Sequence, residues 1–150
     1  MMKLLRALVG LLIGIGYGWV IGAITLRLLR LTFDPRYPGP MIPDKNGWAM
    51  FTAFVVTVIT AFCAALAGIA VGLARANALR GAVIGAGVGA GFFLLFTLLN
   101  VIGYWGWLMR EPAHVWPLLL RDVGATFVVL PLGLPLVGLI TGLITSKLKG

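Results

Sequence analysis

The chain of 150 residues has 61% hydrophobic and only 11% charged residues, with a mean hydropathy of +1.07. Soluble domains carry about 25% charged residues, so this composition excludes an ordinary soluble fold. The net charge of +8 does not indicate a nucleic-acid partner, because the basic residues lie near the ends of apolar segments, as they do at membrane surfaces. The composition predicts an all-α integral membrane protein with membrane lipids as its surroundings.

Four apolar segments are long enough to cross about 30 Å of hydrocarbon as helices. They cover residues 4–26, 48–74, 82–104 and 123–145. Lipid favours helices because a spanning segment has to satisfy its own backbone hydrogen bonds. We therefore expect residues 1–150 to form a single four-helix transmembrane domain. The single cysteine, Cys63, excludes an intrachain disulfide and a multi-cysteine metal site.

The first segment, 4–26, carries a glycine at every fourth position. These glycines are Gly10, Gly14, Gly18 and Gly22. The spacing keeps them along one edge of a helix, which favours close helix packing in lipid. Four of the eight prolines follow within residues 31–47, and proline at that density forbids a continuous helix. We expect a long interfacial loop over 31–47.

A short basic turn without acidic residues, which includes Arg75 and Arg80, joins the second and third segments. The third segment begins with a glycine-rich run, and its four-residue spacing extends the predicted packing interface. The glycines of this run in the interface are Gly81, Gly85 and Gly89. The segment ends in aromatic residues, which are typical of the water interface of a membrane.

Residues 105–122 precede the fourth segment, and we expect them to form a second interfacial loop with a short helix. They include the single histidine, His114. His114 is a weak candidate for a metal ligand, because no cysteine or acidic cluster accompanies it. The sequence therefore predicts no metal and no cofactor.

The fourth segment, 123–145, has an irregular centre. Pro131, Gly133 and Pro135 predict a kink near the middle of the bilayer, because each proline removes a backbone donor. Broken helices of this kind can expose backbone groups along a transport path. The small-residue spacing then resumes at Gly138 and Gly142.

Four spans place both termini and the turn at 75–80 on one side of the membrane. Each side then carries six basic residues, so the positive-inside rule alone gives a tie. All four acidic residues fall on the other side. We therefore expect a bacterial inner (plasma) membrane protein with cytoplasmic termini.

The two halves of the chain show a weak similarity. A shift of 75 residues aligns Gly10, Gly14 and Gly16 with glycines of the third segment. Under this interpretation each half is a helical hairpin, and the halves are parallel repeats. The alternative is a chance match between two glycine-rich spans.

No known family is recognisable in the chain, and its motifs do not indicate an enzyme. It lacks a Ser–His–Asp set, a paired-acid site, an HExxH motif and a phosphate-binding loop. No ionisable residue lies in the middle of a predicted span, which argues against an ion-coupled pump. We expect a non-catalytic structural or accessory subunit of a larger respiratory, photosynthetic or transport complex, docking partner helices through its glycine faces. The alternative is a small homo-oligomeric channel or transporter that uses the broken fourth helix and the threonines.

Overall fold

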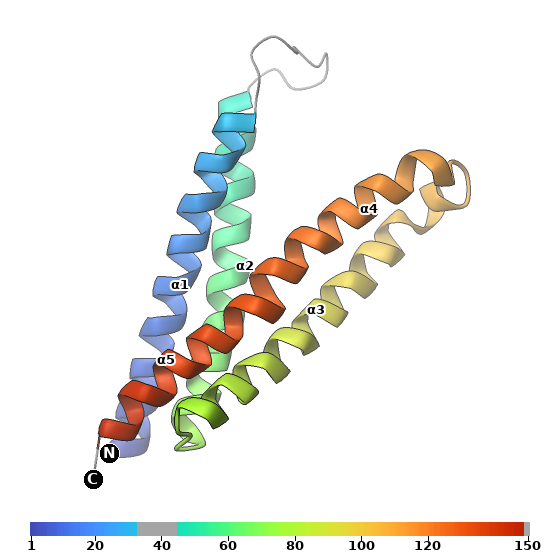
Figure 1. The fold of residues 1–150 in the computed structure, drawn as a ribbon. Helices are drawn as coiled ribbons and strands as arrows, with labels where there is room; N and C mark the ends of the chain where they lie inside the picture. Colours follow the sequence, from blue (N-terminus) through green and yellow to red (C-terminus); the bar gives the residue numbers. More distant parts are fainter. Residues whose placement is uncertain (33–44, 149–150) are drawn as a thin grey trace.

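The computed structural model describes residues 1–32 and 45–148, and these contain helices and no strands. The helices are α1 (Met2–Thr32), α2 (Lys45–Leu73), α3 (Ala78–Leu108), α4 (Pro112–Phe127) and α5 (Gly133–Lys147), with a π-helical turn η1 (Val128–Leu132) before α5 (Figure 1). Four helical stretches of the described chain are long and apolar enough to span a membrane: Met2–Leu28, Met50–Leu73, Ala78–Gly106 and Val129–Lys147. The all-helical prediction with four potential spans is therefore confirmed.

The loop predicted over 105–122 needs correction. In the structure α3 continues to Leu108 and α4 begins at Pro112, so only Met109–Glu111 separates the two helices. A proline at the first residue of a helix is tolerated, because the N–H that it lacks would have no partner in the helix. The other predicted loop, 31–47, is helical at both ends, and its centre at 33–44 lies outside the described residues.

A tight turn joins α2 to α3. The N–H of Ala76 donates to the carbonyl of Val71 at 3.3 Å, while Arg75 adopts a left-handed conformation with φ of 50°. This is the arrangement of a Schellman-type helix end. The side-chain oxygen of Asn77 then accepts the N–H of Arg80 at 2.9 Å and caps the start of α3.

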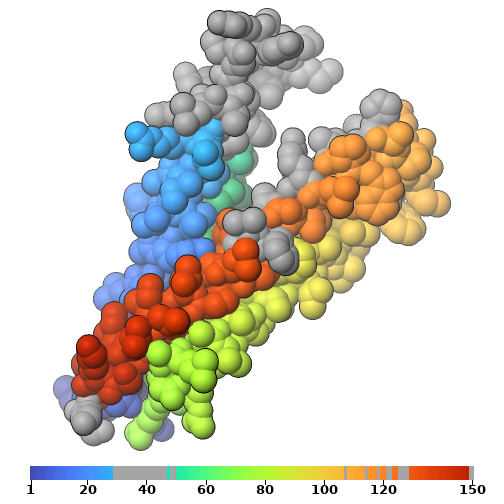
Figure 2. Space-filling model, in the orientation of Figure 1, coloured from blue at the N-terminus to red at the C-terminus, as the bar shows by residue number. Residues whose placement is uncertain are grey.

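The helices form two hairpins. The first hairpin consists of α1 and α2, and the second consists of α3 with α4, η1 and α5 (Figure 1). Both chain ends and the α2–α3 turn lie at one end of the molecule, which we call the terminal end (Figure 1). The hairpins touch near this end and diverge away from it, and α5 lies between α1 and α3 on the face seen in Figure 2.

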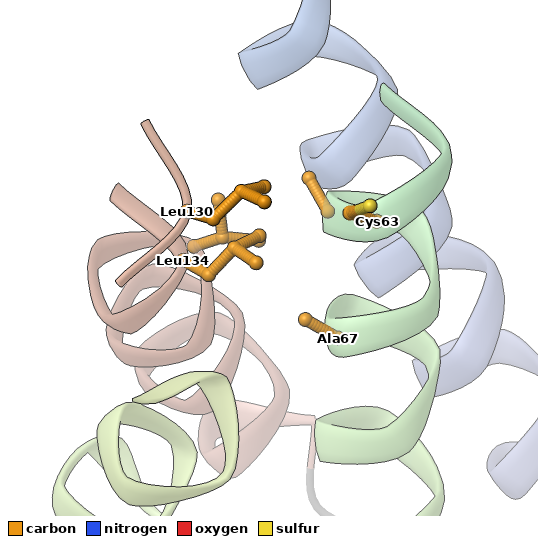
Figure 3. Close-up of a cluster of buried hydrophobic side chains, with 6 residues drawn as sticks. Cys63, Ala67, Leu130 and Leu134 are labelled. Atoms are coloured by element: carbon orange, nitrogen blue, oxygen red, sulfur yellow. The ribbon is translucent and has the colours of Figure 1, made fainter. Parts of the chain in front are cut away.

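The hairpins meet along α2 and α5. Six side chains from these helices and from η1 form a buried cluster, each at most 2% exposed: Cys63, Ala64, Ala67, Leu130, Leu134 and Val137. In Figure 3 the leucines of the second hairpin point towards the α2 residues Cys63 and Ala67. Large apolar side chains on the outer faces are exposed, which suits contact with lipid. The pair α2 and α5 is thus the centre of the molecule.

Candidate functional site

The glycine edge of α1 lies against α2. A Cβ atom built on Gly10 or Gly14 would stand closer than 3.0 Å to the backbone of Gly68 or Ala64. The same holds at Gly18, against Ala61. At the far end of the edge, a Cβ on Gly22 would meet the Thr57 hydroxyl, which donates to the carbonyl of Ala53 at 2.7 Å. The two backbones therefore approach as closely as glycine allows.

The glycine edge of α3 lies against α5 and η1 in the same way. A Cβ on Gly81 would stand closer than 3.0 Å to the carbonyl oxygen of Gly138, and a Cβ on Gly85 would meet that of Leu134. At Gly89 the atom in the way is the carbonyl oxygen of Leu130. Within each hairpin the two helices thus contact each other along backbone surfaces, and not through interleaved large side chains.

All nine glycines of the predicted packing interface make their close contacts within the chain. They are Gly10, Gly14, Gly18, Gly22, Gly81, Gly85, Gly89, Gly138 and Gly142, the last against Asn77. The sequence left open whether their partner is the same chain or another. Six other glycines have nothing within 4 Å of the Cβ position: Gly16, Gly87, Gly91, Gly103, Gly106 and Gly124. Among the glycines whose surroundings are described, these six leave room for an additional helix.

The irregular centre of the fourth segment coincides with the π-helical turn η1, which contains Pro131. Turns of this kind inside helices are rare and often mark functional positions. The hydroxyl of Tyr17 on α1 donates to the carbonyl of Val129 in this turn at 3.0 Å. Gly133 leaves space for the hydroxyl, because a Cβ at this position would stand closer than 3.0 Å to it. Tyr17 thus links the two hairpins by a polar contact at the break, while the predicted bend of the axis at Pro131 and Pro135 stays a prediction.

Arg6 forms a second link, at the terminal end. Its side chain is only 8% exposed and donates to the carbonyl oxygen of Leu148, just after α5 ends. Its buried Nε has no hydrogen-bond partner among the described residues. A cation at a helix C-terminus is favourable, because the last carbonyls carry partial negative charge. The sequence did not single out Arg6 or Tyr17 as linking residues.

The threonines named as candidates for a path lie in different surroundings. Thr57 lies between α1 and α2, whereas Thr141 is fully buried on α5 and its Oγ1 has no hydrogen-bond partner in the described chain. Thr145 donates to the carbonyl of Thr141 at 2.8 Å, a bond within its own helix. The use of the threonines as a transport path stays a prediction.

Metal-ligating residues do not gather in the described chain. It contains no group of three or more His, Cys, Asp and Glu side chains that could hold a metal ion. His114 belongs to α4, and its side chain lies outside the described residues. Cys63 is a free, buried thiol in the central cluster. No protein-family model, curated protein or solved structure matches the chain.

Proposed function

We propose that the protein is a non-catalytic structural or accessory subunit of a larger membrane complex. The observation that supports this is the outer face of α3, formed by Val83, Gly87, Ala90, Gly91 and Leu94, all of them exposed. Gly87 and Gly91 stand one helical turn apart with nothing within 4 Å of their Cβ positions. In lipid such a surface admits the backbone of another helix.

The burial of the four spans points to the same face. Only 11% of the most apolar stretch of α3 is buried inside the structure, against 22%, 39% and 44% for the other spans. The edges with the tightest glycine contacts are already occupied within the chain. We therefore place the docking of a partner transmembrane helix on the outer face of α3, and not on the glycine edges that the sequence suggested.

Native mass determination in mild detergent tests this function. We expect the wild-type chain to be isolated together with membrane proteins other than copies of itself. The Gly87→Leu variant should be isolated alone and still be folded. A leucine at Gly87 fills the space that the partner backbone would occupy. Gly16→Leu, the same change at an open glycine on α1, serves as the control and should keep the partner. A wild-type chain that is monomeric, or a Gly87→Leu variant that keeps its partner, would contradict the proposal.

A small homo-oligomeric channel or transporter is the second candidate. The contact of Tyr17 with the π-helical turn favours it, because discontinuous helices at the interface of two helical units form substrate sites in many transporters. We propose for this case that the fourth span bends at Pro131 and Pro135, by more than about 20°. The same mass measurement would then give a closed ring of identical chains and no foreign partner.

We further propose that the terminal end faces the cytoplasm of a bacterial cell. Five basic residues of the described chain lie near this end: Lys3, Arg6, Arg75, Arg80 and Lys147. Of the four acidic residues, Glu111 lies in the turn between α3 and α4 at the opposite end and Asp122 lies in α4, while positions 34 and 44 lie outside the described residues. A short basic connection of this kind is typical of the cytoplasmic side.

Cysteine labelling of intact cells tests the orientation. In a Cys63→Ala background, single cysteines replace Asn77 at the terminal end or Met109 at the opposite end, both of which are exposed. A membrane-impermeant thiol reagent should label position 109 and spare position 77. Labelling of position 77 alone would show the opposite orientation. As a control, lysed cells should be labelled at both positions.

A further inference from the structure

The contacts within the two hairpins follow one register. In the first hairpin Gly10, Gly14 and Gly18 meet Gly68, Ala64 and Ala61; in the second, Gly81, Gly85 and Gly89 meet Gly138, Leu134 and Leu130–Pro131. A shift of 71 residues converts Gly10, Gly14 and Gly18 into Gly81, Gly85 and Gly89, and a shift of 70 converts their partners on α2 into residues of η1 and α5. The contact of Gly72 with Arg6 and Ala7 likewise becomes that of Gly142 with Asn77 and Ala78. The correspondence ends at Gly22, whose equivalent by this shift of 71 is Phe93.

The same shifts relate the surfaces along which the hairpins meet. Four buried residues of α2, namely Thr60, Ala64, Ala67 and Val71, become Leu130, Leu134, Val137 and Thr141, which are all buried as well. Tyr17 on α1 becomes Val88 on α3, and both side chains pack partly buried against the central cluster. In addition α2 contacts both α3 and α5, while α5 contacts both α1 and α2.

We infer that the chain is a tandem repeat of one helical hairpin, and that each copy presents the equivalent face to the other. Because the hairpins run in the same direction, the repeats are parallel and related by a pseudo-twofold axis along the membrane normal, with α2 and α5 beside it. The shift of 75 residues suggested by the sequence is wrong by one helical turn, since Gly10 corresponds to Gly81 and not to Gly85.

The two copies differ in side-chain volume at the axis. On α2 the central positions are small, with Ala64 and Ala67, whereas the equivalent positions of the second hairpin hold Leu134 and Val137. A pair made of two copies of the first hairpin would leave a void at this surface. A pair made of two copies of the second hairpin would place large side chains against each other. Both arrangements are unfavourable. The surface therefore selects one small and one large copy, so the partner of each hairpin is the other hairpin of the same chain.

An exchange of volume across the axis in the full-length chain tests the inference. Ala67→Leu adds bulk, Leu134→Ala removes it, and the double variant restores the total volume of the cluster. We expect each single change to lower the folded-to-unfolded ratio in a detergent titration by about tenfold or more. The double variant should recover most of this loss. Leu136→Ala, on the exposed face of α5, is the control and should stay within about threefold of wild type.

A milder exchange covers the case in which the leucine variant does not fold. Ala67→Val and Val137→Ala swap the residues of the two repeats at equivalent positions, and the double variant should again fold better than the worse single one. If the losses of the single variants simply add in both pairs, the two surfaces are not complementary and the inference is wrong.

Discussion

Replacing Gly14 or Gly85 by leucine is expected to abolish the native fold, whereas the same replacement two residues further along each helix should leave it intact. At Gly14 the first atom of the new side chain would stand closer than 3.0 Å to the backbone of Ala64 and Ala65, and at Gly85 to the carbonyl of Leu134. A backbone cannot rotate away as a side chain can, so the helices must separate. The cost should exceed the about 1–3 kcal/mol of ordinary overpacking.

Gly16→Leu and Gly87→Leu are the matched controls. Both positions lie on the same two helices and have nothing within 4 Å of the Cβ position. Leucine also has a higher helix propensity than glycine, by up to about 1 kcal/mol, so neither control should lose stability. The measurement is the fraction of monodisperse, helical protein in mild detergent, followed through a titration with a denaturing detergent.

Removing large side chains from the outer faces should matter much less than adding one to a glycine edge. Leu12→Ala and Leu94→Ala delete side chains that are 67% and 66% exposed, so neither deletion opens a cavity inside the chain. In a soluble protein the loss of leucine is often severe, because the leucine is part of the core. If Leu12→Ala were as damaging as Gly14→Leu, the glycine contacts would not be what holds the hairpin together.

The number of spans could be predicted from the sequence because hydropathy and length alone decide it. The glycine spacing on α1 and α3 predicts a packing interface along one edge of each helix. It could not indicate the partners, since a flat glycine edge fits any other small surface equally well. Gly10 meets Gly68 and Gly81 meets Gly138 because the register of the two helices in each hairpin places them together.

The extent of the helix over Pro112–Phe127 is harder to predict from the sequence than the short helix expected there. Prolines at positions 112 and 117 favour a loop, although Pro112 is the first residue of the helix, where its missing N–H costs nothing. Tyr17 was missed because its role depends on a carbonyl 112 residues away in the sequence. A single hydroxyl-bearing aromatic side chain in the middle of a span is the signal that could have drawn attention to it.

Gly133→Ala is expected to weaken the contact between the hairpins, and Tyr17→Phe should relieve only part of that effect, because the ring carbon Cζ would still stand 2.6 Å from the new methyl group. The methyl group would stand closer than 3.0 Å to the hydroxyl of Tyr17, so the ring must move and its bond to the carbonyl of Val129 is lost. Displacing the ring should cost about 1–3 kcal/mol, and the hydrogen bond adds about 0.6 kcal/mol on average between membrane helices. In the Tyr17→Phe background the hydrogen bond is already absent and the closest contact is gone, so the loss should be smaller, although the ring must still move away from the methyl group.

The four proteins of this double-mutant cycle can be compared by the same detergent titration. Tyr17→Phe alone should be mild, at most about 1.7 kcal/mol, the upper end for such bonds. Gly124→Ala is the control, since it adds the same methyl group at an open position of α4 and should be neutral or slightly stabilising. Equal losses for Gly133→Ala in the two backgrounds would show that the Tyr17 hydroxyl contributes nothing to the contact beside Gly133. A clear interaction between the two changes would instead identify this contact as the polar link that holds the hairpins together at the π-helical turn.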